Sequence, residues 1–148
     1  MEKMETCEQL RLENQLCFPL YAAARQVVNL YTPLLKPLGI TYTQYLVFLV
    51  LGECECVTVG EIGKKLYLDN GTLSPLLKKL EKEGYVLRTR SAEDERIVRI
   101  CLTGEGRAFY ERLSEVPKNV GSCINIAPEK AGQLYQLLYE LLANTHGE

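Results

Sequence analysis

The chain has 148 residues and six cysteines, its formal net charge at pH 7 is −2, and 47% of its residues are hydrophobic. This is enough for one domain with a core of its own. No apolar run is long enough to cross a membrane, and residues 1–6 lack the apolar core of a signal peptide. We therefore expect a cytosolic protein, not a membrane protein or a secreted disulfide scaffold, and we expect its cysteines to be reduced thiols.

Residues 8–36 are predicted to form a long helix, because apolar side chains recur at three- and four-residue steps. Pro19 interrupts this pattern, since a proline has no backbone N–H and its ring crowds the carbonyl four residues earlier. The helix therefore either kinks at Pro19 or begins anew near Phe18. Pro33 and Pro37 are expected to close the segment.

A second helix is predicted over residues 44–52, with Thr41 or Thr43 as its N-cap. Its apolar positions are expected to point into the core: Leu46, Phe48, Leu49 and Leu51. Residues 53–56, which include two cysteines, are interpreted as a connector to the next unit.

Two short helices are predicted after this connector. Thr58 and Glu61 have the spacing of a capping box, in which the threonine oxygen accepts a backbone N–H and the glutamate reaches back, so a helix should run to about Leu66. Asp69 is expected to cap a second helix, and Gly84 to end it in the left-handed conformation. Four leucines share one face of this second helix: Leu73, Leu76, Leu77 and Leu80.

Two strands are predicted over residues 85–90 and 97–102, around a polar turn at residues 91–96. Helix, turn, helix and two-stranded ribbon is the order of a winged helix-turn-helix. Its second helix has the size to enter a DNA major groove, and the tip of the ribbon carries Arg96. The sequence therefore predicts a mainly helical fold with one small β-ribbon, the wing.

The remaining chain is predicted to be helical. Thr103 is expected to cap a helix that runs to about Val116, and Pro117 and Gly121 should disturb its continuation. Pro128 suits an early position of a last helix. That helix carries a leucine stripe: Leu134, Leu137, Leu138, Leu141 and Leu142.

The helices at both ends of the chain are too apolar to be solvated alone. We expect a single domain over residues 1–148, in which residues 57–103 form the DNA-binding unit and residues 8–36 and 104–146 form a shared homodimer interface. A single winged helix has too small a footprint for tight operator binding, which favours the dimer. The alternative is a monomer in which the terminal helices only cover the central unit.

Charge is distributed unevenly along the chain. Residues 57–102 hold nine Lys and Arg against seven Asp and Glu, a local net charge of +2 in a chain whose total is −2. This segregation suits a protein that approaches DNA phosphates in one orientation. From charge alone, a solvated surface without a ligand is an equally good interpretation.

Several motifs resemble those of the MarR family of dimeric bacterial transcription regulators, over nearly the whole chain. They are residues 68–81, 94–96 and 102–103. Three further motifs are similar to the branch that senses organic hydroperoxides: residues 16–21 (Leu-Cys-Phe-Pro-Leu-Tyr), 67–69 (Tyr-Leu-Asp) and 72–75 (Thr-Leu-Ser-Pro). The resemblance implies a winged-helix homodimer that binds double-stranded operator DNA. We expect no enzymatic activity and no cofactor.

Cys17 is the candidate redox sensor. The thiolate reacts with peroxide, and a helix that begins at the proline interruption would place Cys17 at its N-terminal end, where the backbone field favours an anion. The resemblance implies that Tyr31 and Tyr42 of the partner subunit hydrogen-bond the sulfur, and that Phe18 and Tyr21 help to line the pocket. The alternative is that Cys17 is a small buried hydrophobe, the usual role of a free cysteine.

The other cysteines are weaker candidates. The resemblance implies that Cys123 can be the resolving cysteine, whereas the alternative is an incidental thiol, with the sensor capped by a low-molecular-weight thiol. Cys101 is interpreted as a packing residue. Cys54 and Cys56 suggest a soft metal, but structural zinc usually needs four ligands and the single histidine is His146, so no metal site is predicted.

On DNA, the second helix is expected to place Thr72, Ser74 and Pro75 against base edges, through hydroxyl hydrogen bonds and contact of the proline ring with a thymine methyl. Four basic residues are expected at phosphates: Lys78, Lys79, Arg88 and Arg90. Arg96 should enter the minor groove, and the resemblance implies that Asp94 orients the turn by pairing with a ribbon arginine.

The predicted function is redox-controlled transcriptional repression. The reduced dimer binds the operator, and oxidation of Cys17 by an organic hydroperoxide repacks the dimer and releases it. Two alternatives stay open. One is a MarR-type regulator released by a small aromatic or phenolic ligand, and the other is a thiol peroxidase, for which the sequence offers a cysteine but no catalytic surroundings.

Overall fold

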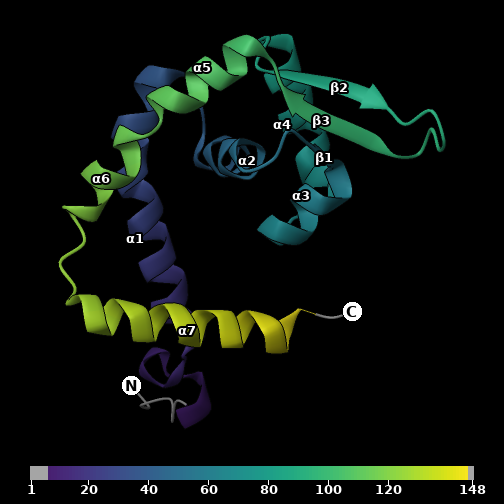
Figure 1. The fold of residues 1–148 in the computed structure, drawn as a ribbon. Helices are drawn as coiled ribbons and strands as arrows, with labels where there is room; N and C mark the ends of the chain where they lie inside the picture. Colours follow the sequence, from purple (N-terminus) through teal and green to yellow (C-terminus); the bar gives the residue numbers. More distant parts are fainter. Residues whose placement is uncertain (1–6, 147–148) are drawn as a thin grey trace, which may run out of the picture.

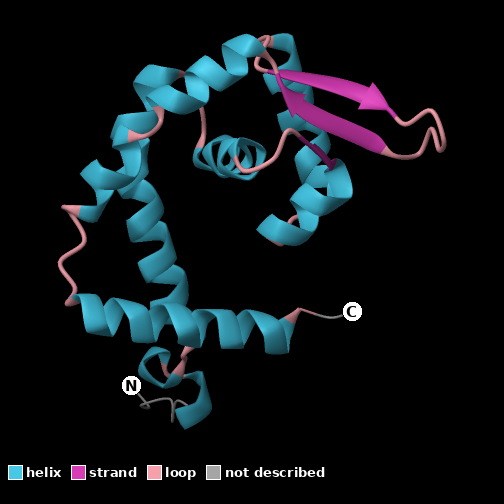
Figure 2. Cartoon of the chain, in the orientation of Figure 1, coloured by secondary structure: helices cyan, strands magenta, loops and turns pink. Residues whose placement is uncertain are grey.

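The structure, a computed structural model, describes residues 7–146. Residues 1–6, where no signal peptide is expected, and residues 147–148 lie outside the described part. Within that part the chain is mainly helical, with seven α-helices, three 3-10 helices and one antiparallel sheet (Figure 1). The predicted fold class is therefore confirmed, although the sheet has three strands, not two (Figure 2).

The start of the chain is broken into three pieces: η1 (Glu8–Leu10), η2 (Leu12–Asn14) and α1 (Cys17–Leu35). The prediction of one helix over residues 8–36 is wrong for its first part, and the alternative of a new start near Phe18 is confirmed. Pro19 lies in the first turn of α1, where a missing N–H costs no helical hydrogen bond. Pro33 lies inside α1 and does not end it.

The central helix of the fold follows η3 (Lys36–Leu38) and is α2 (Tyr42–Gly52). Thr41 is its N-cap and forms a capping box with Gln44. The predicted core face is confirmed in part, because two of the four predicted positions are only half-buried. The buried residues of α2 lie on more than one face: Gln44, Tyr45, Val47, Phe48, Val50 and Leu51.

The helix-turn-helix consists of α3 (Val59–Leu66) and α4 (Asn70–Lys82). Both predicted caps are confirmed. The Thr58 N–H donates to the Glu61 carboxylate at 2.7 Å and the Glu61 N–H returns to the threonine hydroxyl at 3.1 Å. Asp69 accepts the N–H of Thr72 at 2.7 Å. α4 itself carries three fully buried leucines, Leu73, Leu77 and Leu80. The fourth leucine of the predicted face, Leu76, is half-buried.

The turn between α3 and α4 depends on two backbone features. Tyr67 ends α3 in the left-handed region with φ 55°, which is costly for a residue other than glycine. A Cβ atom on Gly63 would lie 2.7 Å from the carbonyl oxygen of Leu68, so a larger residue at this position would push the turn open. The helix-turn-helix therefore needs glycine at position 63.

The sheet contains three strands in the order β1-β3-β2: β1 (Cys56–Thr58), β2 (Val86–Arg90) and β3 (Val98–Leu102). β2 and β3 are the predicted ribbon, and Gly84 before them has the expected left-handed conformation, with φ 83°. β1 corrects the interpretation of residues 53–56 as a connector only. It pairs with β3 so that Cys56 lies opposite Cys101, and the two form a disulfide. The expectation of reduced cysteines is wrong for this pair, and Cys101 is more than a packing residue.

The C-terminal part consists of three helices: α5 (Gly104–Arg112), α6 (Glu115–Gly121) and α7 (Pro128–Thr145). Thr103 caps α5 as predicted, because its hydroxyl accepts the N–H of Gly106 at 3.0 Å. The helix predicted to reach Val116 ends earlier, and Pro117 lies in the first turn of α6. α7 begins at Pro128 as predicted and has no buried residue. Figure 1 shows α7 and the start of α1 lying away from the body formed by α2 and the sheet.

The core lies between α2, the helix-turn-helix and the sheet. Three aromatic rings pack together in it and connect α2 to α5: Phe48 of α2 lies 5.0 Å from Phe109 of α5 and 5.8 Å from Tyr85, which precedes β2, measured between ring centroids. No single helix in the described part is long and apolar enough to span a membrane. One pair bent by 80°, Cys17–Leu38 with Tyr42–Gly52, meets that test by length and composition when taken together.

Candidate DNA interface and thiol site

The solvent-facing side of α4 carries the residues predicted to read bases. Thr72 and Pro75 are exposed and Ser74, at the flank, is half-buried. The Thr72 N–H is already bonded to the cap Asp69, so only its hydroxyl is available to a base. Lys78 is exposed next to this strip and has no ion-pair partner within residues 7–146.

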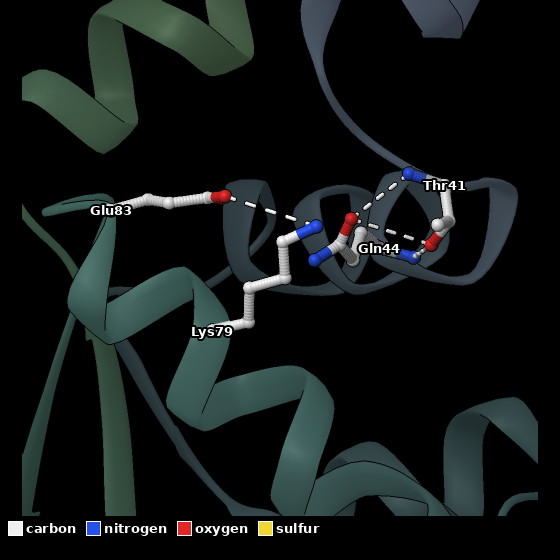
Figure 3. A network of polar contacts seen from close by, with 4 residues as sticks. All are labelled: Thr41, Gln44, Lys79 and Glu83. Atoms are coloured by element: carbon white, nitrogen blue, oxygen red, sulfur yellow. Dashed lines mark hydrogen bonds and ion pairs between the residues drawn. The ribbon is translucent and has the colours of Figure 1, made fainter.

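Two of the four predicted phosphate contacts are paired with carboxylates. Lys79 reaches from α4 toward Gln44 at the start of α2, and its ammonium lies 3.9 Å from Glu83 (Figure 3). Arg88 of β2 lies 3.7 Å from Glu81. DNA would have to compete with these carboxylates, which the sequence prediction did not consider.

The wing extends away from the core and ends in a short, ordered turn (Figure 2). The Ser91 N–H donates to the Ile97 carbonyl at 2.8 Å and closes the ribbon. Asp94 accepts the backbone N–H of Arg96 at 3.0 Å, so its carboxylate orders the turn through the backbone. No ion pair joins Asp94 to a ribbon arginine among residues 7–146. Arg90 and Arg96 are exposed, with their side chains free to meet DNA.

The two neighbouring lysines of α4 provide a matched prediction. Lys78→Ala is expected to lower operator affinity evenly across sequences and to reduce the slope of log affinity against log salt by about 1, because one phosphate contact is lost. Lys79→Ala is expected to have a smaller effect on both, since its charge is already partly neutralised by Glu83. Titration of a labelled operator at several salt concentrations measures both quantities. A larger effect for Lys79 would contradict this placement of the interface.

Cys17 is the first residue of α1 and is exposed, as the prediction of an N-terminal position requires. Its Sγ lies 4.0 Å from the amide oxygen of Gln15. Phe18 and Tyr21 beside it are exposed large apolar side chains. The alternative of a small buried hydrophobe therefore does not describe Cys17 in this protomer.

Three tyrosines cluster at the other end of α1. The rings of Tyr31 and Tyr42 lie 4.8 Å apart, and Tyr45 lies 5.4 Å and 6.1 Å from them. Burial and the neighbouring Tyr31 raise the pKa of Tyr42, and the same two causes, with Tyr42 and Tyr110, raise the pKa of Tyr45 to about 12. Both hydroxyls therefore keep their protons at neutral pH and are hydrogen-bond donors. Sequence reasoning missed Tyr45. The predicted helix began at residue 44, and only a helix that begins at residue 42, as α2 does, places Tyr42 and Tyr45 three residues apart on one side.

Within one protomer the thiol and the tyrosines are far apart. Cys17 and Tyr31 are separated by 14 residues of continuous helix, which corresponds to about 21 Å at 1.5 Å per residue. A straight α-helix cannot bring its two ends together. Any contact between the Cys17 sulfur and the tyrosine hydroxyls must therefore use a second chain.

Cys123 lies just after α6, in the segment that leads to α7. It is exposed, and its Sγ lies 3.4 Å from the carbonyl oxygen of Asn119. The structure therefore leaves this thiol accessible, as a resolving cysteine would need to be. Within the described residues no group of three or more His, Cys, Asp or Glu could hold a metal ion.

The terminal helices expose much of their apolar surface. α7 buries nothing and α1 buries only Leu35. The exposed large apolar side chains of these segments include Leu10, Leu12, Leu16, Leu20, Leu134, Tyr135, Leu137 and Leu141. Exposed apolar side chains in this number, on segments that bury almost none of their own residues, are typical of a protein–protein interface.

Comparison with known proteins agrees with this architecture. Residues 29–113 match the family described as transcriptional regulator SarA/Rot. The organic hydroperoxide resistance transcriptional regulator of Bacillus subtilis is 45% identical over 139 residues, which are 94% of this chain and 95% of that protein. A mutant MarR from Escherichia coli in complex with operator DNA has a TM-score of 0.74 and 26% identity, over 86% of this chain and 93% of that chain.

The chain belongs to the MarR family of transcriptional regulators.

Structures of AbfR, a protein of Staphylococcus epidermidis, align with nearly all of this MarR-family chain. Overoxidized AbfR bound to DNA has a TM-score of 0.76 at 39% identity, over 94% of this chain and 98% of that chain. Reduced AbfR bound to DNA has a TM-score of 0.74 at 38% identity, over 93% of this chain and 96% of that chain. Disulfide-formed AbfR has a lower TM-score, 0.63, at 41% identity, over 91% of this chain and 95% of that chain. The protomer is therefore closer in shape to the DNA-bound forms than to the disulfide form.

Proposed function

We propose that this regulator is a homodimeric, thiol-based repressor that binds operator DNA when reduced and is released when an organic hydroperoxide oxidises Cys17. The observation that carries the proposal is the divided thiol site. The exposed sulfur lies at one end of α1 and the tyrosine cluster at the other, while the exposed apolar side chains near the sulfur have no partner among residues 7–146.

A two-fold dimer completes this site. Antiparallel association of the α1 and α7 helices would bury their exposed leucines and bring Cys17 of one chain toward Tyr31 and Tyr42 of the other, because a two-fold axis places each patch against its own copy. The tyrosine hydroxyls would then donate to the thiolate and stabilise it. The two DNA-binding units would lie on the same side, one for each half-site.

The releasing state is proposed to be a disulfide between Cys17 and Cys123. AbfR has been observed on DNA in its reduced and overoxidized forms, and its disulfide form is the one that this protomer resembles least. A bond between the two cysteines requires their Cα atoms to come within about 7 Å, which would rearrange the segment between α6 and α7. In the proposed dimer this segment and α1 both belong to the interface. Their movement would therefore change the distance between the two DNA-binding units.

An operator-binding assay tests the proposal. The reduced wild-type protein is titrated onto its promoter DNA with and without cumene hydroperoxide, and in parallel with a panel of phenols and hydrogen peroxide. The proposal is supported if cumene hydroperoxide removes the protein from DNA, the phenols and hydrogen peroxide do not, and dithiothreitol restores the complex. Release by a phenol without oxidant would instead favour a ligand-controlled regulator, and catalytic turnover of hydroperoxide with a reductant would favour a thiol peroxidase.

Removing one tyrosine donor is expected to slow the reaction of Cys17. Tyr42→Phe should lower the rate of Cys17 alkylation by iodoacetamide at neutral pH by about tenfold, because a hydrogen bond to a charged group contributes about 1.5 kcal/mol. Tyr85→Phe is the matched control, since its ring packs against Phe48 and Phe109, away from the tyrosine cluster. Peptide mass spectrometry measures the rate at Cys17 itself. Equal rates in the two variants would exclude Tyr42 as a donor.

A further inference from the structure

Two cysteines lie opposite each other at the root of the wing, apart from the thiol site described above. Cys56 of β1 pairs with Cys101 of β3, and the two form a disulfide with their Cα atoms 4.3 Å apart. Opposed residues of antiparallel strands come this close at non-hydrogen-bonded pairs, whatever their side chains. The strand pairing therefore holds the two sulfurs within bonding reach when they are thiols, and closing the bond requires no movement of the backbone.

The bond encloses the core of the DNA-binding unit. Its ends are 45 residues apart in sequence, and α3, α4 and β2 all lie within the loop that it closes. β1 has only three residues, and its last residue, Thr58, is also the N-cap of α3. A cross-link at Cys56 therefore fastens the start of the helix-turn-helix to the central strand of the sheet. Closing a long loop restricts the unfolded chain and so favours the folded unit.

The bond is accessible to reagents. Cys56 is exposed and Cys101 is half-buried, so an oxidant can reach the Cys56 thiol and an external thiolate can attack the Cys56 sulfur of the disulfide. Cys54 is close in sequence, but the register places Cys56 and not Cys54 opposite Cys101. Exposure and register together make this pair chemically reversible and specific.

We propose that Cys56 and Cys101 are a second redox site, a reversible staple that strengthens the DNA-binding unit when oxidised and does not release DNA. The Cys56 thiolate attacks the O–O bond of a hydroperoxide, which gives a sulfenic acid and an alcohol. The Cys101 thiol then attacks the sulfenic sulfur, the S–S bond forms and water leaves, so two electrons pass from the thiols to the peroxide. A dithiol reductant restores both thiols and is itself oxidised to a disulfide.

This site differs from Cys17 in the consequence of oxidation. A Cys17 disulfide would move two segments toward each other, whereas the bond between Cys56 and Cys101 joins atoms that strand pairing already holds in place. The inference goes beyond the proposed function and does not rest on it. Its first two readouts, the thiol count and the melting temperature, require no DNA.

The test uses the full chain with Cys17→Ser and Cys123→Ser, which leaves four cysteines. After cumene hydroperoxide, alkylation and mass spectrometry are expected to show two remaining thiols, a cross-linked Cys56–Cys101 peptide and no covalent dimer. The melting temperature is expected to rise by at least about 5 °C and to fall back after dithiothreitol. Operator affinity is expected to stay within about twofold, because the backbone does not move.

Two single substitutions in this background are the controls. Cys56→Ser removes one of the two sulfurs, so oxidation should give no cross-linked peptide and no rise in melting temperature. Cys54→Ser leaves the pair intact, so oxidation should still give both the cross-linked peptide and the rise. Any of three results would overturn the proposed reversible disulfide. They are four thiols after oxidation, an unchanged melting temperature despite the bond, and a loss of operator affinity of about tenfold or more on oxidation. Failure of the proposed function would instead appear as wild-type operator complexes that persist in peroxide.

Discussion

Cys17→Ser is expected to stay on the operator at hydroperoxide concentrations that remove the wild-type protein. Under reducing conditions the two proteins should bind equally, because residue 17 lies at the start of α1, in a different part of the fold from α4 and the wing. In peroxide the wild type should lose affinity by about 100-fold, a coupling free energy of roughly 3 kcal/mol, and the variant should lose none. Titration of a labelled operator measures this difference.

Non-reducing electrophoresis identifies the oxidised state in the same samples. A covalent dimer that is lost equally in Cys17→Ser and Cys123→Ser supports an intersubunit disulfide between the two positions. Cys7→Ser is the matched control, since Cys7 is also exposed and free. A covalent dimer that survives Cys123→Ser, or a mixed adduct of Cys17 with a small thiol and no dimer, would remove Cys123 from the mechanism while leaving Cys17 as the sensor.

The features that were predictable from sequence are those encoded within three or four residues. The capping box of Thr58 and Glu61, the cap at Asp69 and the left-handed Gly84 are each defined by side chains that bond to their own neighbouring backbone. The start of α1 near Phe18 belongs to the same class, because proline excludes the helix interior by its own geometry. These local signals were sufficient to place the helix-turn-helix and the wing.

The missed features depend on residues far apart in the chain. β1 has three residues, too few to show an alternating pattern, and it exists because β3 pairs with it. The disulfide follows from that register and could not be read from the spacing of Cys56 and Cys101. The ion pair of Arg88 with Glu81 likewise joins β2 to α4, whereas the pair of Lys79 with Glu83 spans one helical turn and was visible in the sequence.

The candidate thiol site was predictable only in part. Pro19 left two alternatives open, a kink or a new helix start, and only the second places Cys17 at a helix N-terminus, as the structure does. The roles of Tyr31 and Tyr42 came from the family resemblance and not from their spacing. Tyr45 was missed because the helical pattern of α2 is apolar on nearly all sides, which hides the one face that carries the tyrosines. The pairing of the sulfur with these tyrosines involves a second chain, and a single sequence does not encode that geometry locally.

Leu137→Asp is expected to convert the proposed dimer into monomers at micromolar concentration. Leu137 of α7 is 62% exposed in the protomer, on a helix that buries no residue of its own. In the proposed dimer the new carboxylate would be buried without a partner, which costs several kcal/mol, and two-fold symmetry would repeat that cost at the second copy. Sedimentation velocity measures the dissociation. Operator affinity should fall by at least about 100-fold, because each half-site is then bound separately.

Leu87→Asp is the matched control for this substitution, since Leu87 is 54% exposed but lies on β2 of the wing. It introduces the same charge at a similar exposure, so it should leave the sedimentation of the dimer unchanged. If Leu137→Asp also sediments as a dimer, α7 does not form the interface. The apolar surface of α7 would then need another partner, and the contact between Cys17 and the tyrosines of a second chain would have to arise from α1 alone.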